Sequence, residues 1–159
     1  QRGDAVWKQP VMIVTAAFLH HLAPFVLVAM LAIQLVLLRQ PITAENAKRL
    51  GVIDSVLGAS AGTLLIVGLL RVFFFEKGAA YYFSSHAFLT KFGLFIVIGL
   101  ASIVPTREFM RWRKAMKAGR APDADPKKVQ TIRKIVHWEL AGVVLILLCA
   151  AMMARGGFI

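Results

Sequence analysis

Two adjacent histidines, His20 and His21, are the residues of this sequence with the clearest capacity for chemistry. They lie inside a long apolar run, where an ionisable side chain is costly and is therefore a candidate functional group. Adjacent helical residues point about 100° apart, so one imidazole can face a bundle interior while the other meets a neighbouring helix. Imidazole is a common axial ligand of haem b, and bundle interiors hold such cofactors. We expect a haem b, metal or proton site here, with a plain hydrogen bond to the backbone as the alternative.

Further ionisable residues interrupt the other apolar runs. They are Asp54, Arg71, His86, Lys91, His137 and Glu139. We assign Arg71, His86 and Lys91 to the outer half of a membrane protein, with the two histidines, and the other three to the inner half. The sequence thus predicts an outer cofactor-binding pocket and a separate inner set of polar residues.

Two of these residues have specific expected roles. The planar fork of Arg71 suits a carboxylate or a haem propionate, whereas a salt bridge with Glu76 or snorkelling to the interface is the alternative. Lys91 is expected at the solvated rim. Asp54 and His137 could form a pair between helices or a proton entry point, but ion pairing with the basic loop is the favoured interpretation.

Depth in the membrane limits how these histidines could share one iron. His21 lies about 15 Å from the outer start of its run, and His137 lies about 4–9 Å from the inner end of the last one, at 1.5 Å per residue. His86 is close to the outer rim. In a hydrocarbon core of about 30 Å no pair is level, which favours ligation by a single histidine or by mixed ligands.

Four apolar runs must position these side chains. The expected helices cover about 11–38, 51–75, 88–110 and 131–154, each long enough to cross a bilayer. Hydrophobic residues make up 58% of the chain, above the roughly 45–50% of soluble domains. We predict an all-α integral membrane protein, with residues 1–159 forming one up-down four-helix bundle in contact with lipid.

The distribution of positive charge predicts how the bundle is oriented. Of the 19 Lys and Arg, three lie in residues 39–50 and ten in residues 107–134, and these two connections share one side of the membrane. Short basic loops stay in the cytoplasm, so both termini are expected outside it, in the periplasm. Because topology explains the basic segments, a net charge of +11 does not point to nucleic acid.

Several residues predict local packing. Pro24 should kink the first helix and free the carbonyl of His20. GASAG at 58–62 matches the GxxxG pattern, which lets two helices approach closely. Trp112 and Trp138 suit an interfacial belt. The sequence contains no motif for nucleophilic catalysis or for a phosphate-binding loop, so we set these two classes of function aside.

Four segments resemble a bacterial family of four-helix membrane proteins whose function is unknown. They are FLHHLAPFVLVAMLAIQLVLL, GLLRVFFFEKGAAYYF, KFGLFIVIGLASIVPTREFMRW and ELAGVVLILLCAAMMARG. The resemblance covers about residues 15–157 and implies a multi-pass protein of the bacterial inner membrane. A more distant likeness, to the membrane protoporphyrinogen oxidase and the copper-resistance D proteins, implies His20 or His21 as a haem ligand and Lys91 or Arg71 as a substrate or propionate partner.

These observations favour a small b-type haem or redox protein, with a quinone or porphyrin as partner and oxidoreductase chemistry left open. A non-catalytic subunit of a larger membrane complex or of a homo-oligomer is the first alternative. A small metal or proton carrier that uses the same histidines is the second.

Overall fold

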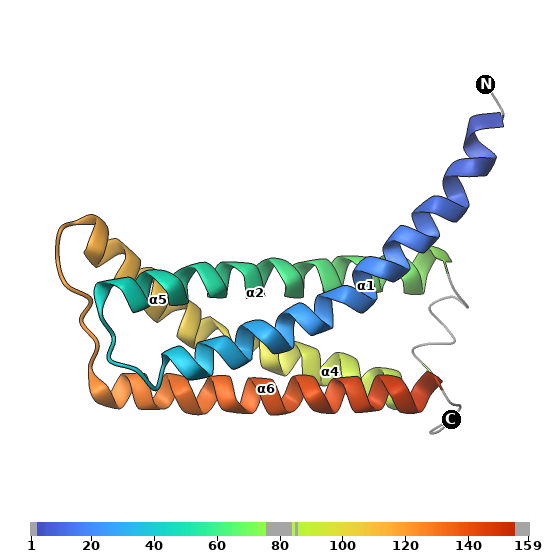
Figure 1. The fold of residues 1–159 in the computed structure, drawn as a ribbon. Helices are drawn as coiled ribbons and strands as arrows, with labels where there is room; N and C mark the ends of the chain where they lie inside the picture. The colour runs from blue at the N-terminus through green and yellow to red at the C-terminus, as the bar shows by residue number, and fades with distance from the viewer. Residues whose placement is uncertain (1–2, 76–83, 85, 155–159) are drawn as a thin grey trace.

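The computed structural model describes residues 3–75, 84 and 86–154 and shows an all-α bundle (Figure 1). Its elements are α1 (Gly3–Leu37), α2 (Ala44–Leu70), the π-helical turn η1 (Arg71–Phe75), α4 (His86–Ala101), α5 (Ile103–Lys117) and α6 (Pro126–Ala154). Four stretches in this part of the chain are long and apolar enough to cross a membrane: Val11–Leu37, Ala44–Phe74, Phe88–Lys117 and Pro126–Met152. The predicted four-span membrane bundle is confirmed.

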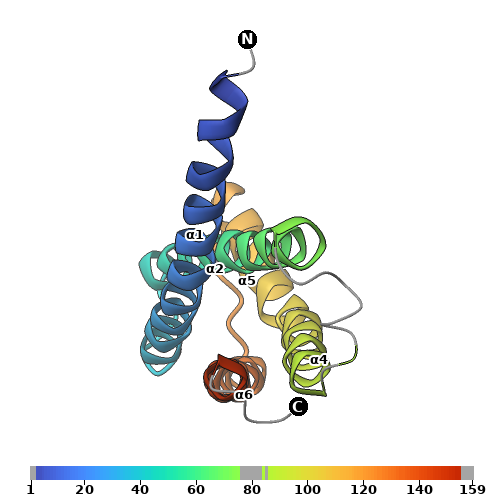
Figure 2. The same ribbon diagram turned by 90° about the vertical axis from the view of Figure 1, so that its right-hand side faces the viewer.

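The spans alternate in direction around a common interior. α1 packs against α2 and α6, while α2 packs against α5 and α4 packs against α6 (Figure 2). The two connections at 38–43 and 118–125 lie at one end of the bundle, here called the loop end (Figure 1). α1 begins and α6 ends at the opposite end, the terminal end. The two basic segments, residues 39–50 and 107–134, include these connections and therefore share one end, as the up-down topology requires.

Helix α2 begins earlier than its apolar run. Thr43, in an extended conformation, accepts a hydrogen bond from the backbone N–H of Asn46 at 3.2 Å and so caps the helix. The Asn46 side chain also donates to the Pro41 carbonyl at 2.9 Å, which fixes the preceding turn. The helix therefore starts at Ala44 instead of near Gly51, because a capped polar turn can be helical without being hydrophobic.

The third span is divided at Ser102, where the sequence predicted one helix. Pro105 has no N–H to donate to the carbonyl of Ala101, four residues earlier, and its ring crowds that carbonyl. The chain turns at Ser102, and helical bonding resumes with Thr106 N–H donating to the Ser102 carbonyl at 3.1 Å. Pro105 is itself fully buried, so the break lies inside the bundle.

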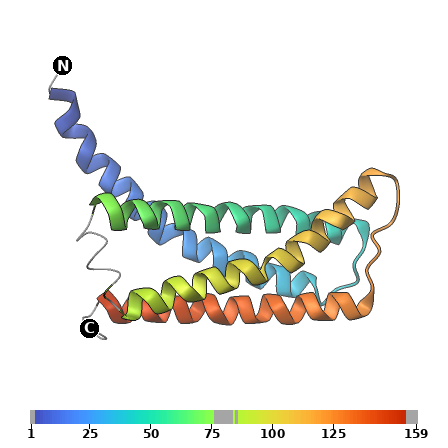
Figure 3. The same cartoon turned by 180° about the vertical axis from the view of Figure 1, so that it is seen from behind.

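Pro24, by contrast, does not divide α1. The helix is continuous from Gly3 to Leu37. Figures 1 and 3 show the N-terminal part of α1 inclined away from the other helices. The proline that separates two helices is thus Pro105, not Pro24.

The apolar core is concentrated toward the loop end. It contains residues from α1, α2, α5 and α6, among them Leu31, Leu50, Phe109, Trp112 and Val136. The Phe109 and Trp112 rings are 5.4 Å apart, and the Trp112 indole N–H donates to the Asp123 carbonyl at 3.1 Å. The belt position expected for Trp112 is therefore wrong, since its side chain is only 1% exposed. It holds the 118–125 connection against the core instead.

Close helix contacts do not occur at the predicted GxxxG pattern. A Cβ added at Gly58 or Gly62 would meet nothing within 4 Å. A Cβ at Gly142 of α6 would lie 2.6 Å from Ile98 Cδ1 of α4, and one at Gly68 of α2 would lie 3.3 Å from His20 Cε1. The glycines that allow close approach are thus Gly68 and Gly142, neither of which belongs to the motif.

Candidate functional site

A partly buried polar cluster lies where all four spans meet. Its members are Gln34 of α1, Asp54 of α2, Ser102 and Thr106 from the break in the third span, and Glu139 of α6. Ser102 Oγ donates to Glu139 Oε1 at 2.9 Å, and Thr106 Oγ1 donates to Asp54 Oδ1 at 3.0 Å. Gln34 is 1% exposed and Glu139 is 2% exposed. We call these five residues the carboxyl cluster.

The spacing of Ser102 and Thr106 explains why the two hydroxyls face the two carboxyls. Ser102 and Thr106 are four residues apart, a spacing that places side chains on one face of a helix. A helical Ser or Thr commonly bonds back to its own helix, as Ser60 does to the Val56 carbonyl at 2.9 Å. At the break the hydroxyls reach across to other helices instead, and so connect α2 and α6 through the third span.

Two buried atoms of the cluster lack hydrogen bonds. Gln34 Nε2 and Glu139 Oε2 have no partner of normal geometry. The Gln34 amide is nevertheless close enough to interact with Asp54, and the Asp54 carboxyl is close enough to act electrostatically on Glu139. In the part of the chain that the structure describes, neither carboxyl forms an ion pair. The cluster therefore brings together two acids, with spare hydrogen-bonding capacity and no cation to balance their charge.

This arrangement limits the chemistry of the cluster. Buried carboxylates are expensive unless a cation, a metal or a proton neutralises them. Ionisable groups that face a bundle interior characteristically form ion pathways and proton relays. Two carboxyls joined to hydroxyls and an amide can accept, hold and pass on a proton. They offer no activated nucleophile.

The predicted outer pocket is assembled only in part. The His20 ring is half-buried and packs on Gly68, with its Nδ1 atom 3.7 Å from where a Cβ would stand. Arg71 follows Gly68 by three residues, so it lies about one turn along the same face of the second span. His21 is exposed, and its ring centroid is 6.1 Å from that of His20 in an edge-on arrangement. His20 is thus the histidine of the pair that faces another helix.

The other outer residues lie at the start of α4. His86 is exposed, and Lys91 is half-buried with its Nζ 5.3 Å from the centroid of the Phe88 ring, a cation–π distance. Glu76, the alternative partner of Arg71, lies outside the described residues. Among the described side chains, no group of three or more His, Cys, Asp and Glu could hold a metal ion together.

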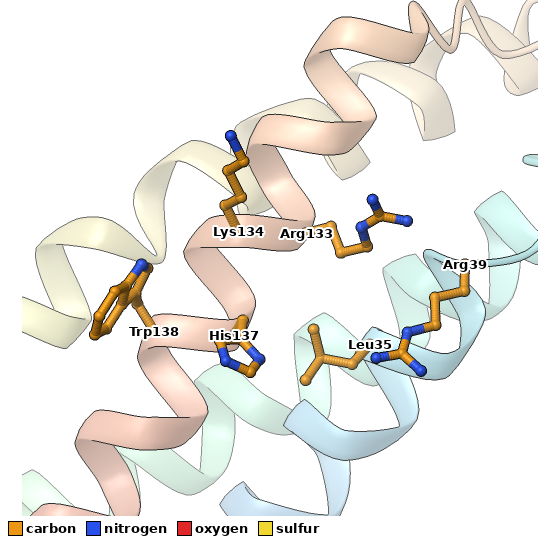
Figure 4. A pocket seen from close by; sticks show the side chains of 6 residues that line it. All are labelled: Leu35, Arg39, Arg133, Lys134, His137 and Trp138. Atoms are coloured by element: carbon orange, nitrogen blue, oxygen red, sulfur yellow. The ribbon is translucent and has the colours of Figure 1, made fainter.

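His137 and Asp54, predicted as a possible pair, have separate surroundings. His137 is exposed and lines a surface groove between α1 and α6, whereas Asp54 accepts its hydrogen bond from Thr106 (Figure 4). Glu139, assigned with them to the inner set of polar residues, is buried in the carboxyl cluster. Glu108, elsewhere on α5, forms an ion pair in which its Oε2 lies 3.8 Å from an Arg111 guanidinium nitrogen.

Comparison with known proteins gives a family. The sequence model of a family described as "Predicted membrane protein (DUF2214)" matches residues 13–157. The chain belongs to this family. Membership agrees with the four spans and with the resemblance found in the sequence. No curated protein and no solved structure matches the chain. The likeness to protoporphyrinogen oxidase and copper-resistance D proteins therefore stays a prediction.

Three members of the carboxyl cluster of this family member were not anticipated: Gln34, Ser102 and Thr106. Gln34 is uncharged and lies within a long apolar run, so it does not stand out as an ionisable residue. Ser102 and Thr106 flank Pro105, which lies inside the helix predicted over 88–110. The missed signal was a proline with hydroxyl residues three positions before and one position after it, within a membrane span.

Proposed function

We propose that this protein binds and transfers protons within the membrane through the half-buried carboxyl of Asp54 and the buried carboxyl of Glu139. The observation that carries the proposal is that these acids come from different spans, are each hydrogen-bonded to a hydroxyl from the third span, and have no described cationic partner. This is the proton-carrier alternative raised by the sequence, moved from the histidines to the carboxyl cluster.

Electrostatics support a proton as the neutralising species. Two negative charges in a low-dielectric interior repel each other and lose their hydration. One proton shared by the cluster removes one of these charges, and the unbonded Glu139 Oε2 and Gln34 Nε2 leave room to rearrange hydrogen bonds as it moves. The hydroxyls of Ser102 and Thr106 can each donate or accept, which a proton relay requires.

The test is proton flux into proteoliposomes that contain a pH-sensitive dye. The wild-type protein should dissipate an imposed pH gradient once an ionophore balances the charge. Glu139→Gln and Asp54→Asn keep side-chain shape but cannot carry the proton, and should slow the flux by about 100-fold or more, the usual contribution of a positioned acid–base group.

Glu108→Gln is the matched control, because it removes a largely buried carboxyl outside the cluster whose described partner is Arg111. It should leave the flux unchanged. Flux that is insensitive to both cluster substitutions would contradict the proposal. Absence of flux from wild-type vesicles, together with a partner protein that co-purifies stably, would favour the accessory-subunit alternative instead.

A haem b or redox site at the outer residues remains a second candidate. The specific observation in its favour is His20, which faces α2 one turn from Arg71. The fit is incomplete, because the His20 ring is packed on Gly68 while His21 and His86 are exposed. These residues provide at most a single-histidine site with Arg71 beside it. A haem absorption band from purified protein that is lost in His20→Ala but kept in His21→Ala would support this candidate.

The orientation is also a proposal. The loop end carries both basic connections, and the positive-inside rule places that end in the cytoplasm and both termini in the periplasm of a bacterial inner membrane. Fusion of a periplasmic reporter to the C-terminus tests this, since activity of the reporter is expected only outside the cytoplasm.

A further inference from the structure

A cationic groove runs between α1 and α6 at the loop end. It is lined by Leu35, Arg39, Arg133, Lys134, His137 and Trp138 (Figure 4). We propose that this groove binds the phosphate-bearing headgroup of an anionic phospholipid, with the acyl chains lying along the apolar surfaces of the two helices. The proposal concerns a lipid site and is independent of the carboxyl cluster.

Charge complementarity supports an anionic occupant. Arg39 comes from the turn that follows α1, whereas Arg133 and Lys134 come from the first half of α6, so two separate segments contribute cations to one groove. No acidic residue lines it. In the described part of the chain, none of these three side chains forms an ion pair. Three exposed cations without carboxylate partners attract phosphate, for which the arginine fork is well suited.

The position of the groove supports a lipid as the source of the phosphate. Trp138 is 75% exposed, and an exposed indole in a membrane span is typical of the headgroup region. Lys134 is one turn nearer the loop end, as expected for a cation that meets headgroups. Farther from the loop end, the face of α6 that carries His137 is apolar, with Val144 and Leu148 exposed seven and eleven residues after it. Cations at the level of the headgroups, followed by apolar surface deeper in the membrane, match the polar head and the acyl chains of a diacyl phospholipid.

The periodicity of α6 organises the groove. Arg133 and His137 are four residues apart, as are Lys134 and Trp138, so each pair shares a helix face. In the first pair the imidazole lies one turn farther from the loop end than the guanidinium. In the second pair the indole lies one turn farther from the loop end than the ammonium. On each of these two adjoining faces, the cation can therefore contact the lipid headgroup, and the ring one turn deeper can contact the start of the acyl chains.

Quenching of Trp138 fluorescence by brominated lipids tests the proposal. Protein in mixed micelles is titrated with dibromo-phosphatidylglycerol or dibromo-phosphatidylcholine, and the Trp138 signal is taken as the difference from Trp138→Phe. Each near-surface Lys or Arg adds about fivefold to the attraction of an anionic surface, so a preference of about tenfold or more for phosphatidylglycerol is expected. The triple variant Arg39→Gln, Arg133→Gln, Lys134→Gln should bring this preference to within about twofold of unity.

The matched control is Lys48→Gln, Arg107→Gln, Arg113→Gln. It removes the same number of Lys and Arg from exposed positions that do not line the groove. The preference should survive in this control. Equal loss in both triple variants would show that bulk charge, not the groove, attracts the lipid. Retention in the groove variant, or displacement of the lipid by millimolar inorganic phosphate, would also overturn the proposal.

Discussion

The two ends of the bundle differ in how firmly side chains hold the helices together. At the loop end, Trp112, Phe109 and Leu50 are essentially buried and the connection at 118–125 is fixed to the core. Toward the terminal end, Phe25 and Phe74 are 69% and 75% exposed, a surface that lipid must cover. The difference shows that the loop end supplies the rigid framework, and the carboxyl cluster lies against that framework.

The largest effect is expected from a comparison of two phenylalanine substitutions, one at each end of the bundle. Phe109→Ala at the loop end removes a ring that is 1% exposed and should lower the free energy of unfolding by about 3–5 kcal/mol. Phe74→Ala removes a lipid-facing ring toward the terminal end and should cost much less. Equilibrium unfolding in mixed detergent micelles measures both. Equal losses would show that the two ends are equally well packed.

A smaller effect is expected where α4 and α6 touch. Gly142→Ala places a Cβ 2.6 Å from Ile98 Cδ1, and overpacking of this kind costs about 1–3 kcal/mol. Ile98→Val should relieve part of the loss, because it removes the atom that collides. Gly58→Ala is the control, since its Cβ meets nothing within 4 Å. A loss at Gly58 as large as that at Gly142 would return close packing to the GxxxG pattern.

The smallest expected effect concerns the cap of α2. Thr43→Ala removes the hydrogen bond to Asn46 N–H and should cost about 1 kcal/mol at the loop end. Thr90→Ala, toward the terminal end, removes only a bond to the His86 carbonyl of its own helix and should be nearly neutral. Hydrogen exchange of residues 44–47 reports the cap directly. Unchanged exchange in Thr43→Ala would show that this cap does not contribute to the stability of the loop end.

The fold was largely predictable because crossing a bilayer imposes length and hydrophobicity, which can be read from one sequence. The residues at which helices begin were less predictable. The polar first turn of α2 is helical because Thr43 caps it, and not because it is hydrophobic. The break at Ser102 needed the third dimension, because Pro24 and Pro105 look alike in sequence and only one divides its span.

The site was predictable by residue type but not by partner. Asp54 and Glu139 were identified as costly intramembrane acids, yet their hydroxyl partners come from residues 102–106, far away in sequence. A depth estimate along separate helices gives the level of a residue but not the direction in which its side chain points. Histidine chemistry therefore predicted a site at His20 and His21 and not at the carboxyl cluster.

Infrared difference spectroscopy of the protein in lipid, during a step in external pH, tests the central claim most directly. We predict a carbonyl band of a protonated carboxylic acid that changes with the step, shifts in D₂O, and is reduced or lost in Glu139→Gln and Asp54→Asn but kept in Glu108→Gln. A spectrum without such a band, or a band that both cluster substitutions leave intact, would contradict proton exchange at Asp54 and Glu139.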